Sequence, residues 1–388
     1  MIKIEKIIPG GQALGTLEDG KKVFFWNALP DEEVLDYQVT KTKSHYLEAI
    51  ATSIENKSPY RKAPKDNCYL STSPWQIFDY DYELKTKQEL VVELFREHGI
   101  TISAPKIFTD YQDYHYRNKM EYALYWDNQD SCIKPAFHAR GSHRKVPISQ
   151  SSLERPEIFQ AATNIIKQLN KLKAEARQYQ SLLLRCNQNG EVSGGLYENH
   201  RPHPKFNNLK DQILGFDYSY SPNGFFQINL PVYEMALCEI KKHINTDKVL
   251  DLYSGVGTIG LSVARDKDLT LVECDKHAFN ELQKNTESVD SKLTNSLTTV
   301  LAKSEDVTEY VSHDATVILD PPRAGCGQKL IDKLNSETPE TIIYLSCNPA
   351  TQARDIKLLI NNYKIEDIKT FNFFPHTPHI ENLVVLKR

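Results

Sequence analysis

The stretch Val249-Leu-Asp-Leu-Tyr-Ser-Gly-Val-Gly-Thr-Ile-Gly260 decides the fold of the C-terminal part of this 388-residue chain. A short apolar run ends near Asp251, a glycine-rich loop follows, and a helical pattern begins at Thr258. In open α/β sheets, ligands bind outside the carboxyl ends of the strands, where glycines let the backbone approach a ligand closely. The stretch therefore predicts a site for a nucleotide-like cofactor.

Strand and helix patterns alternate on both sides of this motif. Apolar strands are expected at residues 248–253, 269–274, 316–319 and 341–346, with helices at 258–264, 278–286, 328–335 and 351–361. Such alternation is typical of a doubly wound α/β domain with a mostly parallel sheet. We predict a Rossmann-like domain over residues 216–388.

The first 58 residues show a different pattern, with five short strand-like runs and a hairpin signal at Asp19-Gly20. This pattern predicts a small closed β-barrel of the OB type over residues 1–58. Residues 59–215 mix a helical pattern at 82–97 with strand-like runs, and they predict a central α+β domain. Basic side chains there alternate with aromatic rings, a combination suited to RNA. We select Arg117 and Lys119 as RNA contacts.

Composition limits the class of protein. The net charge of −4 argues against a purely electrostatic nucleic-acid coat, although a local basic face is enough for a nucleic-acid enzyme. The seven cysteines include no CxxC pair, which excludes a zinc ribbon and argues against a disulfide framework. No apolar run approaches the roughly 18–20 residues of a membrane span, and the start lacks a signal-peptide pattern. We expect a cytoplasmic monomer without membrane contact.

An acidic residue and a proline turn narrow the choice of cofactor. Glu273 follows Asp251 by 22 residues, where a carboxylate can accept both ribose hydroxyls, and Gly255 allows close approach. These features alone fit NAD and S-adenosyl-L-methionine equally. The turn Asp320-Pro-Pro-Arg-Ala-Gly325 favours the methyl donor, because a methyltransferase uses a rigid loop at this position and an NAD dehydrogenase does not. Asp320 is expected to face the cofactor pocket.

Two later motifs carry candidate catalytic groups. Cys347 lies where a strand exits, just before a helix, a setting that lowers the pKa of a thiol and favours a nucleophilic thiolate. Glu381 lies between two histidines and a terminal apolar strand, and it is a candidate general base. The alternatives are a buried spectator cysteine and a salt-bridged surface glutamate.

Together these motifs resemble the RNA (uracil-5-)methyltransferase family, which uses S-adenosyl-L-methionine to make 5-methyluridine in rRNA and tRNA. The resemblance is carried by Gly224-Phe-Phe-Gln-Ile-Asn229, Asp251-Leu-Tyr-Ser-Gly-Val-Gly257, Asp320-Pro-Pro-Arg-Ala-Gly325, Ser346-Cys-Asn-Pro349 and Pro375-His-Thr-Pro-His-Ile-Glu381. Upstream, Tyr116-Arg-Asn-Lys-Met-Glu121 is similar to the family's central RNA-binding domain. Residues 1–55 resemble a TRAM domain, an RNA-binding barrel.

The resemblance implies roles for individual residues. Cys347 would attack uracil C6 and Glu381 would remove the C5 proton. The cofactor and uracil pocket would be lined by Gln227, Tyr253, Gly255, Glu273 and Asp320. The target base must leave its stack, and Phe226 or its neighbour Phe225 would stack against it, while Arg323 would contact the RNA. The barrel favours 23S rRNA as substrate, and a tRNA T-loop uridine is the other option.

One departure from the family concerns iron. Many relatives hold a [4Fe–4S] cluster through four cysteines, three of them in a C-x5-C-x2-C run. Only Cys68 matches here, with Pro74 and Ile77 at the partner positions and Ser149-Gln-Ser-Ser152 where the fourth cysteine is expected. We therefore expect no iron–sulfur cluster and no metal site.

Four other functions fit parts of the pattern. An RNA cytosine-5 methyltransferase uses similar chemistry with a nucleophile in the Asp-Pro-Pro loop, where Cys326 stands four residues beyond Pro322. An adenine amino-methyltransferase would have an aromatic residue where Arg323 stands. A non-catalytic RNA-binding protein would not depend on Cys347, and a Rossmann reductase would bind NAD(P)H.

Overall fold

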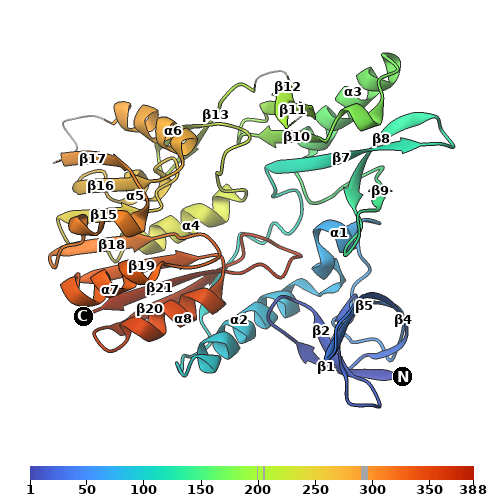
Figure 1. Cartoon of the computed structure of the whole chain (residues 1–388), viewed down its shortest axis with the longest axis horizontal. Coiled ribbons are helices and arrows are strands. Elements are labelled where there is room, and N and C mark those ends of the chain that lie inside the picture. The colour runs from blue at the N-terminus through green and yellow to red at the C-terminus, as the bar shows by residue number, and fades with distance from the viewer. Residues whose placement is uncertain (199, 204–205, 290–295) are drawn as a thin grey trace.

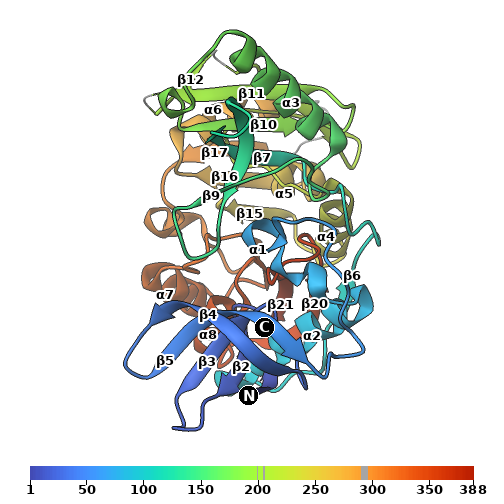
Figure 2. The ribbon, with the colours of Figure 1, turned by 90° about the vertical axis from the view of Figure 1, so that its right-hand side faces the viewer.

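The structure is a computed structural model that describes residues 1–198, 200–203, 206–289 and 296–388. It contains an N-terminal barrel, a central sheet and a large sheet with its helices, which Figure 1 shows in blue, green and yellow to red. Turned by 90°, the central sheet and the barrel lie at opposite ends of the view, and much of the large sheet lies behind them (Figure 2). None of the helices in these described ranges is both long and apolar enough to cross a bilayer.

The N-terminal strands close into a barrel in the order β1-β2-β3-β5-β4. They are β1 (Ile2–Ile7), β2 (Ala13–Thr16), β3 (Lys22–Trp26), β4 (Glu33–Thr42) and β5 (Tyr46–Glu55). Alternate side chains such as Ile2 and Ile4 point into the barrel, as expected for strands with one buried face. The predicted OB-type barrel is confirmed, whereas the likeness to a TRAM domain stays a prediction.

The large sheet has the order β17-β16-β15-β18-β19-β21-β20-β6. Its strands are β6 (Lys106–Phe108), β15 (Lys248–Leu252), β16 (Asp268–Glu273), β17 (Ser296–Leu301), β18 (Ala315–Leu319), β19 (Thr341–Ser346), β20 (Lys364–Phe371) and β21 (Glu381–Lys387). The five strands from β17 to β19 are parallel, and β21 runs antiparallel to both of its neighbours. Strands β18 and β19 are buried throughout, because helices cover both faces of a parallel sheet. The predicted Rossmann-like fold is confirmed.

Four helices lie close to their predicted positions: α5 (Thr258–Val263), α6 (Lys276–Glu287), α7 (Gln328–Glu337) and α8 (Pro349–Leu359). Helix α4 (Leu230–Lys241), before β15, and the short turns η3 (Ser304–Asp306) and η4 (Thr308–Tyr310), before β18, were not predicted. Helix α8 begins with Asn348 as its N-cap and Pro349 in its first turn, two residues earlier than predicted.

The central part is a six-stranded sheet of order β12-β11-β10-β7-β8-β9, followed by the hairpin β13-β14. Its elements are β7 (Lys119–Asp127), β8 (Cys132–His138), β9 (Lys145–Pro147), α3 (Pro156–Lys171), η2 (Ala176–Gln178), β10 (Ser181–Cys186), β11 (Val192–Glu198), β12 (Arg201–His203), β13 (Leu209–Ile213) and β14 (Phe216–Tyr220). Helix α3 packs on this sheet through an apolar stripe formed by Ile158, Ala162, Ile166 and Leu169.

The structure differs from the predicted organisation before residue 110. Helix α1 (Tyr69–Thr72) and the turn η1 (Pro74–Ile77) lead into α2 (Tyr80–Glu97), which packs against α8. Strand β6 then pairs in parallel with β20 at the edge of the large sheet. Strand β6, predicted as part of a central domain over 59–215, therefore belongs to the large sheet. The other predicted boundaries stay a prediction.

The loop of residues 372–380, between β20 and β21, protrudes from the large sheet toward the other two parts (Figure 1). Pro378 in this loop lies against Gly11 of the barrel, so closely that a Cβ built on Gly11 would be 2.1 Å from the Pro378 Cβ. Trp75 donates an indole hydrogen bond of 2.9 Å to the Gly11 carbonyl. The barrel thus contacts this loop through Gly11 and Pro378, and Trp75 of η1 binds the same point of the barrel.

We predict that Gly11→Ala destabilises the protein more than Gly10→Ala. The φ angle is +96° at Gly10 and +89° at Gly11, both in the left-handed region, so alanine at either position costs about 1–2 kcal/mol of backbone strain. Only Gly11→Ala also forces Pro378 to move, which adds roughly 1–3 kcal/mol of overpacking. Urea unfolding of both variants measures the difference, and equal losses would contradict the contact.

Candidate active site

The candidate groups lie where strands of the large sheet leave one edge. Asp251, Glu273, Asp320 and Cys347 stand at or just after the carboxyl ends of β15, β16, β18 and β19. These strands are parallel neighbours, so their ends meet at the same edge. The sequence-predicted cofactor and catalytic positions are therefore brought together.

The antiparallel pairing of β19 with β21 brings in Glu381 from the opposite chain direction. Ser346 of β19 lies directly opposite Asn382 of β21. Cys347 follows Ser346 and Glu381 precedes Asn382, so the thiol and the carboxyl come from adjacent positions at one end of the strand pair. The two groups also lie close enough for the charge of Glu381 to act on Cys347.

Buried amides hold this register. Gln352 of α8 donates from Nε2 to the carbonyls of Tyr344 on β19, at 2.8 Å, and Asn382 on β21, at 3.0 Å. Asn382 returns a hydrogen bond of 2.7 Å to Gln352 Oε1. Both amides are fully buried, so each unmade bond would cost free energy. Sequence reasoning missed this bridge, because nothing in the pattern around Gln352 distinguishes it from an exposed helical glutamine.

The carboxyl groups of the site favour their neutral forms. Burial, and then the nearby charge of Asp320, raise the pKa of Glu381 well above its ordinary value, and the Arg323 guanidinium opposes this shift. Burial also raises the pKa of Asp320 to about 7. Glu381 is only 4% exposed, so little solvent screens these effects.

The expectation of a low thiol pKa at Cys347 is wrong. Burial, Glu381 and Asp320 raise the pKa of the partly buried thiol to about 11, with Arg323 opposing. Cys347 does directly precede the N-cap of α8, but desolvation and two carboxyl groups outweigh the helix terminus. At neutral pH the thiol is therefore protonated before substrate binds.

The turn after Asp320 is tied to the start of α8. The carbonyl of Arg323 accepts from Asn348 Nδ2 at 2.9 Å and from Thr351 Oγ1 at 3.1 Å. Gly325 has a φ of +80°, and a Cβ there would be 2.5 Å from a carboxylate oxygen of Asp355. These contacts fix the Asp320 turn relative to the segment that carries Cys347.

The Arg323 side chain itself is exposed beside the site. Its NH2 group lies 3.4 Å from the Nδ1 atom of His379. Burial and then the charge of Arg323 lower the pKa of His379 to about 4, so this histidine is neutral at neutral pH. A cation that remains exposed at the rim of the site is compatible with the predicted RNA contact of Arg323.

The glycine loop supports a nucleoside-binding function. Glu273 accepts hydrogen bonds from the backbone N–H groups of Gly255, at 2.8 Å, and Asp275, at 2.6 Å, so its carboxylate is fixed beside the loop. A Cβ at Gly255 would meet nothing within 4 Å, whereas a Cβ at Gly257 would be 2.6 Å from Leu282. Gly255 thus borders open space, and Gly257 is required by internal packing.

Asp251 has a structural task within the same loop. The buried carboxyl accepts a hydrogen bond of 2.8 Å from the N–H of Gly260. Burial raises its pKa to about 8, against the effect of that hydrogen bond. It fixes the turn between β15 and α5.

Two other predicted pocket residues differ in how free their side chains are. Gln227 is 8% exposed, and its amide side chain makes no hydrogen bond within the described ranges, while its carbonyl accepts from Asn118 Nδ2 at 2.9 Å. Tyr253 has a φ of +62°, and its hydroxyl donates to Glu305 at 2.6 Å. Gln227 is thus available to a ligand, whereas the Tyr253 hydroxyl already has an acceptor.

The predicted RNA contacts are only partly on the surface. Phe226 is 4% exposed and stacks on Tyr220 with ring centroids 3.8 Å apart, so the prediction that it stacks on the target base is corrected. Its neighbour Phe225 is 74% exposed and is the ring available to a base.

Lys119 and Arg117 also make internal contacts. The ammonium of Lys119 donates to the carbonyls of Asn223 and Gly224, each at 3.1 Å, and burial lowers its pKa to about 8. Arg117 donates from Nε to the Lys119 carbonyl at 2.9 Å. Lys119 therefore fixes the segment that leads into Gln227, a role the sequence did not indicate.

Hydrogen-bonded side chains occupy the segment around Cys68, where the family resemblance raised the question of a cluster. Asp66 accepts from the Ser152 N–H at 3.1 Å and from Gln76 Nε2 at 2.9 Å. Cys68 is buried nearby, and burial raises the pKa of its thiol to about 12. Within the described ranges, no three His, Cys, Asp or Glu side chains are grouped so as to hold a metal ion.

Comparison with known proteins assigns the chain to a class. Residues 207–388 match the profile of a family described as tRNA (uracil-5-)-methyltransferase. An uncharacterised RNA methyltransferase of Prochlorococcus marinus is 29% identical over 423 residues, covering 93% of this chain and 99% of that protein. A tRNA (uracil(54)-C(5))-methyltransferase of Pyrococcus furiosus is 38% identical over 180 residues, covering 46% of this chain and 42% of that protein.

A solved structure is similar over the whole length. The tRNA (uracil-54, C5)-methyltransferase of Pyrococcus abyssi, in complex with S-adenosyl-L-homocysteine, aligns with a TM-score of 0.75 and 25% identity over 100% of both chains. The predicted resemblance to the RNA (uracil-5-)methyltransferases is thereby confirmed, together with the enzyme class and the fold. The predicted cofactor, S-adenosyl-L-methionine, is confirmed by the same matches.

We predict that alkylation of Cys347 by iodoacetamide keeps accelerating up to about pH 10, by about tenfold per pH unit, because only the thiolate reacts and the thiol pKa is about 11. Glu381→Gln removes a carboxyl group that helps to raise this pKa, so it should lower the pKa and speed alkylation at about pH 9. Peptide mass spectrometry measures the rate, with the exposed Cys238 as internal reference. A rate that is already constant above about pH 8 would contradict the raised pKa.

Proposed function

We propose that this S-adenosyl-L-methionine-dependent RNA methyltransferase methylates C5 of a uridine in tRNA, with Cys347 as nucleophile and Glu381 as general base. The observation that carries the proposal is the placement of Cys347 and Glu381 at one end of the β19–β21 pair, with Asp320 acting electrostatically on both. C5 methylation of uracil requires a nucleophile that adds to C6 and a base that removes the C5 proton, and this site offers both groups.

Cys347 provides the activation step. Uracil C5 is a weak nucleophile, and addition of a thiolate to C6 makes it reactive. The thiol proton is released, the C6–S bond forms, and the electrons of the C5=C6 bond move toward the C4 carbonyl. Because the pKa of Cys347 is about 11, this step needs an environment that stabilises the thiolate, and Arg323 is the cation near it.

Glu381 provides the elimination step. Its carboxylate accepts the C5 proton, the electrons of the C–H bond restore the C5=C6 bond, and the C6–S bond breaks to return the Cys347 thiolate. Burial raises the pKa of Glu381, and a carboxylate with a raised pKa is a stronger base than an exposed one. Proton exchange between the two groups then restores the neutral thiol.

The cofactor supplies the methyl group as an electrophile when it is bound. We propose that Glu273 accepts the ribose hydroxyls, because each of its oxygens keeps a lone pair beside the backbone donors that fix it. Gly255 gives the nucleoside access, and Gln227 offers a buried amide without an internal partner in the described part of the chain. Asp320 completes this set at the end of β18.

The choice of tRNA rests on the similar proteins. The sequence favoured 23S rRNA because of the N-terminal barrel, but a protein that aligns over its full length, barrel included, is a tRNA uracil-54 enzyme. The Pyrococcus furiosus relative is also a tRNA (uracil(54)-C(5))-methyltransferase. Both support a T-loop uridine at position 54 as the target. The exposed Phe225 ring next to the Gln227 motif is a stacking surface for a base that has left its stack.

The cytosine alternative receives no support from the structure. Its nucleophile would stand in the Asp-Pro-Pro turn, where the candidate is Cys326. That residue is 7% exposed, its N–H donates to Asp355 at 2.8 Å, and burial raises the pKa of its thiol to about 12. Cys326 packs behind the turn as an internal residue.

We predict that the protein converts uridine to 5-methyluridine in unmodified tRNA with methyl-labelled S-adenosyl-L-methionine. Cys347→Ala should abolish turnover, because no adduct at C6 can form, while Cys238→Ala, an exposed cysteine on α4, should leave it unchanged. Glu381→Gln should accumulate a methylated covalent adduct with RNA, because elimination lacks its base. Nucleoside mass spectrometry and denaturing gels measure both products.

The outcomes separate the alternatives. Label found only in 23S rRNA would show that the substrate is rRNA rather than tRNA. Label in 5-methylcytidine would show that the enzyme methylates cytosine rather than uracil. Full turnover by Cys347→Ala would exclude Cys347 as the nucleophile, and full turnover by Glu381→Gln would exclude Glu381 as the general base.

A further inference from the structure

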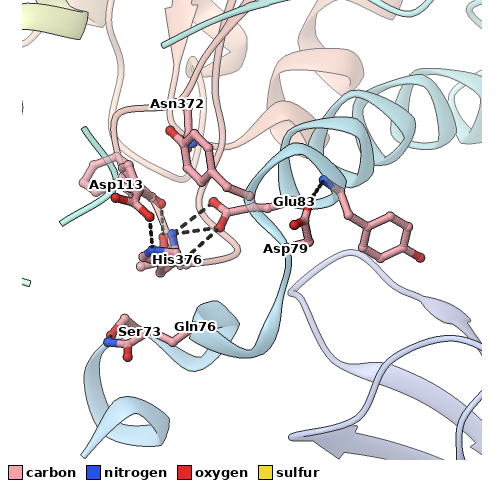
Figure 3. A network of polar contacts seen from close by, with 12 residues as sticks. Ser73, Gln76, Asp79, Glu83, Asp113, Asn372 and His376 are labelled. Carbon is pink, nitrogen blue, oxygen red and sulfur yellow. Dashed lines mark hydrogen bonds and ion pairs between the residues drawn. The ribbon is translucent and has the colours of Figure 1, made fainter. Parts of the chain in front are cut away.

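Four buried or half-buried charged residues lie in or around the 372–380 loop, which leads to Glu381. Glu83 and Lys87, one turn apart on α2, are both 0% exposed, with Lys87 Nζ 2.8 Å from Glu83 Oε1. Asp113 and His376 complete the group, and His376 belongs to the loop itself. Figure 3 shows His376 contacted by Glu83 from one side and by Asp113 from another. Two carboxylates thus face two cations.

His376 receives both carboxylates. Its backbone N–H lies 3.0 Å from both oxygens of Glu83, and its ring Nε2 lies 3.2 Å from Asp113 Oδ2. Burial disfavours the charged ring, but hydrogen bonds to Asp113 and Glu83 outweigh burial and raise the pKa of His376 to about 9. The residue also has a φ of +60°, a conformation that needs support from its surroundings.

Three consecutive carbonyls of the loop are held from outside it. Lys87 donates to the Phe374 carbonyl at 3.0 Å, and the Tyr116 hydroxyl donates to the Pro375 carbonyl at 3.0 Å. The backbone N–H of Trp75 donates to the His376 carbonyl at 3.0 Å. These donors come from α2, from the segment before β7 and from η1. The backbone leading to Glu381 is therefore fixed by the network rather than by the sheet.

We propose that Glu83 is a positioning residue for the general base, which it holds in place through Lys87 and His376. This inference rests on the proposed function, because it assumes that Glu381 performs the elimination step. Cys347 is held separately, by β19, by Gln352 and by the turn after Asp320. Loosening the 372–380 loop should therefore slow proton removal without slowing methyl transfer to the same extent.

Glutamine at position 83 is the sharpest replacement. It keeps the size of the side chain but offers one acceptor oxygen where the carboxylate serves Lys87 and the N–H of His376. Its amide donors would face those same donor groups. Glu89 lies on the same helix with a 62% exposed side chain, and Glu89→Gln makes the same chemical change away from the network.

The test is a single-turnover reaction with tRNA and methyl-labelled S-adenosyl-L-methionine, followed on denaturing gels. We expect Glu83→Gln to slow decay of the methylated adduct by roughly tenfold, a part of the 10²–10⁴-fold that a general base contributes. Methyl incorporation in the first turnover should change by less than about threefold, and Glu89→Gln should match the native protein. Asp113→Asn, at a half-exposed side chain, should give a smaller effect in the same direction and carries the test if Glu83→Gln does not fold.

The outcomes are distinguishable. If Glu381→Gln traps the adduct while Glu83→Gln and Asp113→Asn decay normally, the positioning role is overturned and the proposed function stands. Equal slowing of methyl transfer and adduct decay in both variants would also overturn it, because a general structural role predicts that result. If Glu381→Gln accumulates no adduct, the proposed function itself fails.

Discussion

The antiparallel register of β19 and β21 is the constraint on which the site depends. A shift of one residue in a strand moves every side chain to the other face of the sheet, so the pairing of Ser346 with Asn382 decides whether Cys347 and Glu381 meet. The buried amides of Gln352 and Asn382 make such a shift costly, since each would lose its partners. The same end of the sheet then collects two acidic groups and a thiol in little solvent, which explains why all their pKa values rise together.

Much of the fold was accessible from the sequence, because the signals that encode it are local. The alternation of apolar strands and helices after residue 248 located the central strands β15, β16, β18 and β19 but not β17 or β20, and turn signals such as Asp19-Gly20 marked the barrel. Strand ends also predicted which residues gather at the sheet edge, because parallel strands place their carboxyl ends together. Two adjacent rings such as Phe225 and Phe226 were harder to distinguish, since the burial of Phe226 depends on its contact with Tyr220 of β14.

What the sequence could not show depends on contacts between distant segments. The joining of β6 to the large sheet and the contact of Lys87 with Asn372, which are 285 positions apart, follow no local period. Glu83 and Lys87 look in the sequence like an ordinary exposed pair on a helix. The pKa of Cys347 was predicted from its helix alone, and the opposite result arises first from burial and then from Glu381 and Asp320, which the chain delivers from other strands. Local patterns therefore identified the reactive groups but not their supports.

The contacts of α2 with the 372–380 loop also determine when the active site can form during synthesis of the chain. Residues 80–97 leave the ribosome long before residues 364–387, yet Glu83 and Lys87 find their loop partners only among the latter. During synthesis these two charges must stay hydrated or pair with each other, and β6 lacks its neighbouring strand β20. The N-terminal barrel, whose strands pair only with one another, can close early. The active site is thus completed only after residues 364–387 have been made, which delays any action on RNA until then.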